Sequence, residues 1–233
     1  MEPTPGQLDL ALNGASAPIP VAPLPARLRP MECIDGTSPF DDPDYRFEPW
    51  WPGTRVVLFV ERGEVRPVIE HLADPLTAFP ELRGVGELLG EDGVIIDGTL
   101  LVLDADGRPD ADLLRERLAY PEVRNGEAAF VASDLVWAGG VDLSRRPFAE
   151  RLERLTALLH ETDWCMVARG YVGEGLAVAD ALSSMGLDAM SARHLGSAYR
   201  RGPSAGAWLR VPVVPAVAPD RRPTLALIQR LGL

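Results

Sequence analysis

The residues that most constrain the architecture are Arg55-Val56-Val57-Leu58-Phe59-Val60-Glu61-Arg62-Gly63-Glu64-Val65-Arg66-Pro67-Val68-Ile69. Two β-branched runs flank the polar turn Glu61–Glu64, a pattern that predicts an antiparallel hairpin. Outward from it, strand-like runs and helical stretches alternate irregularly. Strands are predicted at 94–96, 99–103, 128–137, 164–168, 189–193 and 207–213, and helices at 112–119, 147–160 and 175–185. Hairpins mixed with separate helices predict an α+β fold rather than a regular βαβ alternation.

Proline spacing separates the N-terminus from this pattern. Proline falls at nearly every second position from Pro18 to Pro25, which favours extended, solvated backbone. We therefore expect residues 1–27 to form a flexible tail, residues 28–213 to form one domain, and residues 214–233 to form a C-terminal tail with a short helix.

The composition excludes several classes of protein. The 233 residues carry 34 acidic and 23 basic side chains, a net charge of −11, which disfavours non-specific nucleic-acid binding. All the basic residues are arginines, because the sequence contains no lysine. Two cysteines, Cys33 and Cys165, are too few for a disulfide framework or a four-cysteine zinc site, and they fit a reducing cytoplasm. No apolar run is long enough to span a membrane.

Several segments line up, in order, with one known family. They are Phe47-Glu48-Pro49-Trp50-Trp51-Pro52-Gly53-Thr54-Arg55, then Ile96-Asp97-Gly98-Thr99, Ser133-Asp134-Leu135-Val136-Trp137, Asp188-Ala189-Met190-Ser191-Ala192-Arg193, and Trp208-Leu209-Arg210. Each is weak alone, but five in the right order are a strong signal. Over roughly Leu28 to Val213 the chain resembles ATP-dependent DNA ligases, especially the bacterial end-joining type.

The resemblance implies a fold and an activity. The fold is the nucleotidyltransferase domain shared by DNA ligases and mRNA capping enzymes, with antiparallel sheets flanked by helices; the OB-fold domain of complete ligases is not expected in this chain. The activity is nick sealing through a lysine–AMP intermediate, with ATP and Mg²⁺, in DNA repair and recombination. The family's nucleotide-pocket positions fall on Trp50, Pro52, Gly53, Arg55, Thr99, Ser133, Asp188, Arg193 and Arg210.

The positions that depart from the family pattern are those that the family uses for catalysis and for nucleotide binding. The nucleophilic lysine is replaced by Trp50, whose indole nitrogen only donates hydrogen bonds. Pro52 and Thr99 replace carboxylates, Asp188 shortens another, and Ser133 replaces the aromatic residue that stacks on adenine. Arg193 and Arg210 replace lysines but keep the charge. We therefore expect no catalytic residue, no metal site and no cofactor, and Trp50 or Trp51 filling the old nucleotide cavity; an open, arginine-lined pocket with Trp50 at its rim is the alternative.

The leading hypothesis is a catalytically inactive ligase-like protein, a cytoplasmic interaction or structural module with an unidentified protein partner and no membrane association. One alternative is a non-covalent nucleotide or nucleic-acid binder that uses Arg55, Arg193 and Arg210. The other is a retained DNA ligase that acts by an unusual route.

Overall fold

The computed structural model describes residues 23–218 and 222–233. Most of the predicted tail, residues 1–22, therefore lies outside the described residues. Within the described part, no helix is long and apolar enough to cross a membrane.

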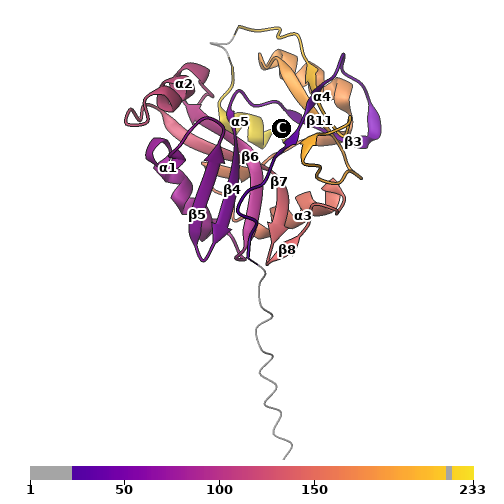
Figure 1. Ribbon diagram of the computed structural model, residues 1–233. Helices are drawn as coiled ribbons and strands as arrows, with labels where there is room; N and C mark the ends of the chain where they lie inside the picture. The colour runs from indigo at the N-terminus through magenta and orange to yellow at the C-terminus, as the bar shows by residue number, and fades with distance from the viewer. Residues whose placement is uncertain (1–22, 219–221) are drawn as a thin grey trace, which may run out of the picture.

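A six-stranded sheet forms the larger half of the domain (Figure 1). Its strands are β4 (Thr54–Glu61), β5 (Glu64–Ile69), β6 (Val94–Leu103), β7 (Glu127–Ala138), β8 (Val141–Asp142) and β9 (Cys165–Val167). The predicted hairpin is β4–β5, paired antiparallel from Val56–Ile69 to Glu61–Glu64. The two runs predicted at 94–96 and 99–103 are one strand, β6, whose register against β7 shifts between Asp97 and Gly98. That irregularity explains why the sequence pattern breaks there.

A five-stranded sheet faces the first, with order β10-β3-β11-β13-β2. Its strands are β2 (Ile34–Asp35), β3 (Asp42–Pro49), β10 (Tyr171–Gly173), β11 (Ala189–His194) and β13 (Trp208–Pro212). The short strands β1 (Met31–Glu32) and β12 (Gly202–Pro203) form a separate parallel pair. Most pairings are antiparallel, as expected, but β7–β9 and β13–β2 are parallel.

Helices surround the sheets, except that the last helix, α5, lies near the centre of the domain (Figure 1). They are α1 (Pro75–Ala78), the 3-10 helix η1 (Pro80–Leu88), α2 (Ala111–Ala119), α3 (Phe148–Leu158), α4 (Gly175–Ser184) and α5 (Leu225–Arg230). The short C-terminal helix is α5, and it lies within the segment predicted as a tail. Leu225, Ile228 and Leu233 from this segment are buried in the core.

Three apolar clusters hold the layers together, and the two faces of the six-stranded sheet divide them. Alternate residues such as Val56, Leu58 and Ile96 pack with α3 and η1 in the first cluster. The opposite face packs against the five-stranded sheet in two places: around Leu101 in the second cluster and around Val57 in the third. Alternation of side chains along each strand produces this division, and the candidate site lies between the second and third clusters.

Candidate nucleotide pocket

A cavity of about 280 Å³ lies between the two sheets. Strands β3, β4, β6, β7, β11 and β13 all contribute to its wall. Of the residues predicted for the nucleotide pocket, the wall contains Trp50, Gly53, Arg55, Thr99, Ser133 and Arg193. Five sequence segments that are far apart along the chain therefore meet at one site, as the resemblance implied.

The remaining three predicted residues lie outside the wall. Asp188 is exposed just before β11, Pro52 is half-buried in the turn after β3, and Arg210 is half-buried on β13. The guanidinium of Arg210 lies 5.6 Å from the ring centre of Trp50, a residue of the wall. These three positions therefore contribute no lining surface.

The two adjacent tryptophans take different environments. Trp51 is 6% exposed and packs into the second apolar cluster. Trp50 is half-buried against the third cluster, with its ring 6.1 Å from that of Trp208. Both line the cavity without filling it. The expectation that one of them fills the cavity is therefore wrong, because apolar clusters on either side hold the two indoles within the wall.

The turn between β3 and β4 depends on a glycine. A Cβ atom at Gly53 would lie 2.5 Å from the carbonyl oxygen of Leu100 and 2.5 Å from Cγ2 of Thr99. Only a residue without a side chain allows the backbone to approach β6 this closely. Gly53 therefore has a packing role that requires no catalysis.

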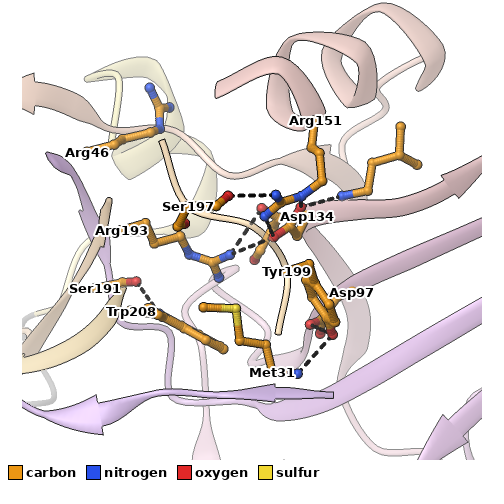
Figure 2. Close-up of polar contacts among 12 residues, drawn as sticks. Met31, Arg46, Asp97, Asp134, Arg151, Ser191, Arg193, Ser197, Tyr199 and Trp208 are labelled. Carbon is orange, nitrogen blue, oxygen red and sulfur yellow. Dashed lines mark hydrogen bonds and ion pairs between the residues drawn. The ribbon is translucent and has the colours of Figure 1, made fainter. Parts of the chain in front are cut away.

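One arginine in the wall, Arg55, is fully engaged by its neighbours. Its Nε donates to Asp97 Oδ1 at 2.8 Å, and its other nitrogens donate to Asp97 Oδ2 and to the carbonyl oxygen of Met31. Tyr199 completes the group by donating to Asp97 Oδ2 at 2.7 Å and accepting from the Met31 amide at 3.1 Å (Figure 2). Burial lowers the pKa of Arg55, but the attraction of Asp97 outweighs this effect and raises it overall. Burial, reinforced by Asp97, raises the pKa of Tyr199.

The second arginine, Arg193, lies between acidic and aromatic side chains. Its Nε is 3.6 Å from Glu48 Oε2, and its Nη1 is 3.8 Å from Asp134 Oδ2. Its guanidinium carbon lies 4.2 Å from the ring centre of Trp208, whose Nε1 donates to Ser191 Oγ at 2.7 Å (Figure 2). Arg55 lies 4.9 Å from the same ring. Both guanidinium groups therefore lie against one indole ring. Arg55 is hydrogen-bonded to Asp97, whereas the buried Nε of Arg193 has no hydrogen-bond partner among the described residues.

A buried ion pair behind the cavity connects β7 to α3. Arg151 donates to Asp134 through Nε at 2.7 Å and through Nη2 at 2.8 Å, and it also donates to the Ser197 carbonyl oxygen at 2.8 Å (Figure 2). Both side chains are almost completely buried. This geometry gives Asp134 and Arg151 a structural role.

The carboxylates of the cavity do not fit a magnesium ion. Asp97 is bound through both oxygens by Arg55 and Tyr199. Glu48 accepts from Arg46 Nε at 2.8 Å and faces Arg193. Magnesium requires free anionic oxygens in near-octahedral geometry. Among the described residues, His, Cys, Asp and Glu side chains form no group of three or more that could hold a metal.

Several wall residues escaped prediction from the sequence. Glu32 and Cys33 lie in the N-terminal segment that carries β1 and β2, and Ser191 lies on β11. Ser191 and Glu48 are inside the quoted motif segments, but only the cross-strand pairing of Glu48 with Ser191 shows that both reach the cavity. No local pattern marks Cys33, whose pKa is raised by burial.

Comparisons with known proteins agree with this geometry. No protein-family model matches the sequence. The chain is 25% identical over 182 residues to the SPbeta prophage-derived DNA ligase-like protein LigB of Bacillus subtilis, covering 78% of this chain and 66% of that protein. It is 30% identical over 159 residues to the multifunctional non-homologous end joining protein LigD of Pseudomonas aeruginosa, covering 67% of this chain and 19% of that protein. The chain thus spans less than two thirds of the length of LigB and a much smaller part of LigD.

Solved structures of DNA ligase domains also match this fold. A mycobacterial DNA ligase D complexed with ATP and MES matches with a TM-score of 0.68 and 25% identity, covering 79% of this chain and 60% of that one. The ligase domain of LigD from M. tuberculosis matches with a TM-score of 0.67 and 26% identity, covering 78% of this chain and 58% of that one. The expected α+β nucleotidyltransferase fold is confirmed. By sequence and by fold, the chain is similar to the nucleotidyltransferase domains of ATP-dependent DNA ligases.

Proposed function

We propose that this chain is a catalytically inactive DNA ligase-like protein, which keeps the nucleotidyltransferase frame and acts by binding rather than by nucleotide transfer. The observation that carries the proposal is the absence of lysine from all 233 residues. Trp50 stands at the nucleophile position and in the cavity wall. An indole nitrogen has no available lone pair, and arginine is never a free base near neutral pH, so neither can attack a phosphate.

The charges around the cavity support the same proposal. Three carboxylates, from Glu32, Glu48 and Asp97, line it against two guanidinium groups, from Arg55 and Arg193. A nucleoside triphosphate brings several further negative charges, and placing them beside a net negative wall is unfavourable at low dielectric constant. Both guanidinium groups already have carboxylate partners. The wall therefore offers little to the phosphates of ATP.

The names of the similar proteins indicate a cellular process for this function. LigD proteins are named for non-homologous end joining, and we infer a role for this chain in cytoplasmic DNA repair or recombination, beside a protein partner. The net charge of −11 makes a protein partner more favourable than direct contact with DNA phosphates. The persistence of an open cavity favours a second candidate function, the non-covalent binding of a small ligand.

Labelling with radioactive ATP tests the proposal. The full chain is incubated with α-labelled ATP and Mg²⁺ or Mn²⁺ over a range of pH, beside an active ligase domain as a positive control. We expect no covalent label on this chain after denaturing gel electrophoresis at alkaline pH, where a P–N bond to AMP survives, and no sealing of nicked duplex DNA. Stoichiometric labelling would overturn the proposal.

A further inference from the structure

Strand β10 (Tyr171–Gly173) forms one edge of the five-stranded sheet and pairs only with β3. Among the described residues, its backbone makes no hydrogen bond to any other segment. Edge strands are usually protected against pairing with another chain by proline or by charged side chains. Strand β5, an edge of the other sheet, has this protection, because it contains Pro67 and the exposed side chains of Glu64 and Arg66. Strand β10 contains neither proline nor charge, so its outer edge is open to a further strand.

Exposed apolar side chains surround this open edge. Tyr171 and Val172 lie on the strand, Leu176 begins α4, and Leu227 and Leu231 lie on α5 and at its C-terminal end. The helix lies beside the strand, because the hydroxyl of Tyr171 donates to the carbonyl oxygen of Leu231 at 2.8 Å. Leu227 and Leu231 are four residues apart and therefore share one face of the helix. Half of the large apolar side chains that are exposed among the described residues belong to this patch, and such clustering marks an interaction surface.

Charges of opposite sign lie at the two ends of the strand. Arg169 precedes β10 and lines a surface pocket together with Arg230 of α5. The exposed Glu174 follows the strand, and Asp41 lies beside it, since Asp41 accepts from the amide of Leu176 at 2.9 Å. An edge that is positive at one end and negative at the other is complementary to a copy of itself turned by 180°.

We propose that β10 is the interface of a two-fold symmetric dimer, in which a second copy of this chain pairs antiparallel along this edge. Pairing centred on Val172 places this residue opposite its own copy and brings Arg169 of each copy beside Glu174 of the other. Three residues of backbone pairing are too few to hold a second chain, so the apolar patch supplies most of the binding energy. Both open edges are used, and the assembly therefore closes at two copies. This interface goes beyond the proposed function and does not depend on whether the chain carries AMP.

Sedimentation equilibrium of the unmodified full chain tests the proposal. The net charge of −11 opposes association, so the measurement is made at about 0.15 M salt, where charges are screened beyond about 8 Å. We expect a monomer–dimer equilibrium with a Kd in about the micromolar range. A chain that stays monomeric at about 100 µM overturns the proposal.

A pair of matched substitutions locates the interface. Val172 and Val68 are exposed valines on edge strands, 48% and 44% exposed, and Val→Glu adds one negative charge to each. In Val172→Glu the two introduced carboxylates face each other across the axis, so the Kd should rise at least about tenfold. Val68→Glu on β5 should leave the Kd within about twofold of the wild type. The proposal is contradicted if folded Val172→Glu dimerises like the wild type, or if Val68→Glu weakens the dimer equally.

A charge exchange tests the antiparallel register. Arg169→Glu and Glu174→Arg each place like charges together across the interface, so each should raise the Kd at least about fivefold. The double variant restores the opposite charges and should return the Kd to within about twofold of the wild type. Arg169 also pairs with Glu161, but that pair is exposed and contributes little to folding, which melting curves of the variants check. Single variants that dimerise like the wild type, or a double variant no tighter than the weaker single one, contradict the proposal.

Discussion

Removing the carboxylate of Asp134 should destabilise the domain severely, because this residue holds β7 to α3. Asp134 accepts two hydrogen bonds from Arg151, and the two side chains are 2% and 1% exposed. In Asp134→Ala the guanidinium of Arg151 keeps only its bonds to the carbonyl oxygens of Arg146 and Ser197. Arg193 loses a second, more distant carboxylate.

The magnitude follows from the burial of the pair. Breaking a buried ion pair on one side costs about 3–5 kcal/mol, because the remaining charge stays buried without compensation. Domains of this kind are stable by about 5–15 kcal/mol, so the loss is a large fraction of the total. With a denaturant slope of about 2–3 kcal/mol/M, the midpoint of urea unfolding should fall by about 1–2.5 M.

The assay is urea denaturation followed by tryptophan fluorescence, with Glu91→Ala as the matched control. Glu91 pairs with Arg154 at 2.8 Å, but the two side chains are 41% and 47% exposed. Exposed pairs contribute about 0–1 kcal/mol, so the control should unfold close to the wild type. A milder variant, Asp134→Asn, should lie between the two. If Asp134→Ala unfolds at the same urea concentration as Glu91→Ala, with an unchanged slope, the buried Asp134–Arg151 pair does not stabilise the domain and the reasoning is refuted.

Three further predictions concern the tryptophans and the cysteines. Trp50→Lys alone should not restore adenylation or nick sealing, because the family's carboxylates and stacking aromatic are replaced as well; robust sealing by this variant would show that the pocket is still competent. Trp51→Ala should lower the free energy of unfolding by about 3–5 kcal/mol, because its ring is buried. Trp50→Ala should lower it by less than about 2 kcal/mol, because its ring is only half-buried. Equal losses in chemical denaturation would contradict this difference in burial. Burial raises the pKa of Cys165 to about 12, so very little of its thiol is ionised at pH 8. Iodoacetamide should therefore modify Cys165 only after unfolding, whereas the half-buried Cys33 should react slowly in the native state. Mass mapping of alkylated peptides measures this, and fast native modification of Cys165 would contradict its burial.

The elements with strong local patterns were predictable from the sequence, and those made by tertiary pairing were not. The hairpin β4–β5 and the helix α3 follow from β-branched alternation and from leucine spacing. Strand β3 was missed because Asp42–Pro49 contains two prolines and several polar residues, which are poor strand formers. It forms because β10 and β11 pair with it on both sides.

The candidate site was also predictable from the sequence only in part. Motif order was enough to gather Trp50, Arg55 and Arg193 around one cavity. The charge balance was not predictable, because each pair joins distant residues: Arg55 with Asp97, and Arg193 with Glu48. The directions of Trp50 and Trp51 also depend on which apolar cluster each side chain reaches, and local sequence carries no signal for that.

Intact-protein mass spectrometry tests the central claim most directly. The full chain is measured as purified, and again after incubation with ATP and Mg²⁺ followed by quenching with EDTA at neutral pH, because a P–N bond to AMP hydrolyses in acid. The account predicts one species with the mass of the unmodified sequence under both conditions, because no lysine is present to carry AMP. A stoichiometric increase by the mass of one AMP, mapped to a residue in the cavity wall, would contradict it.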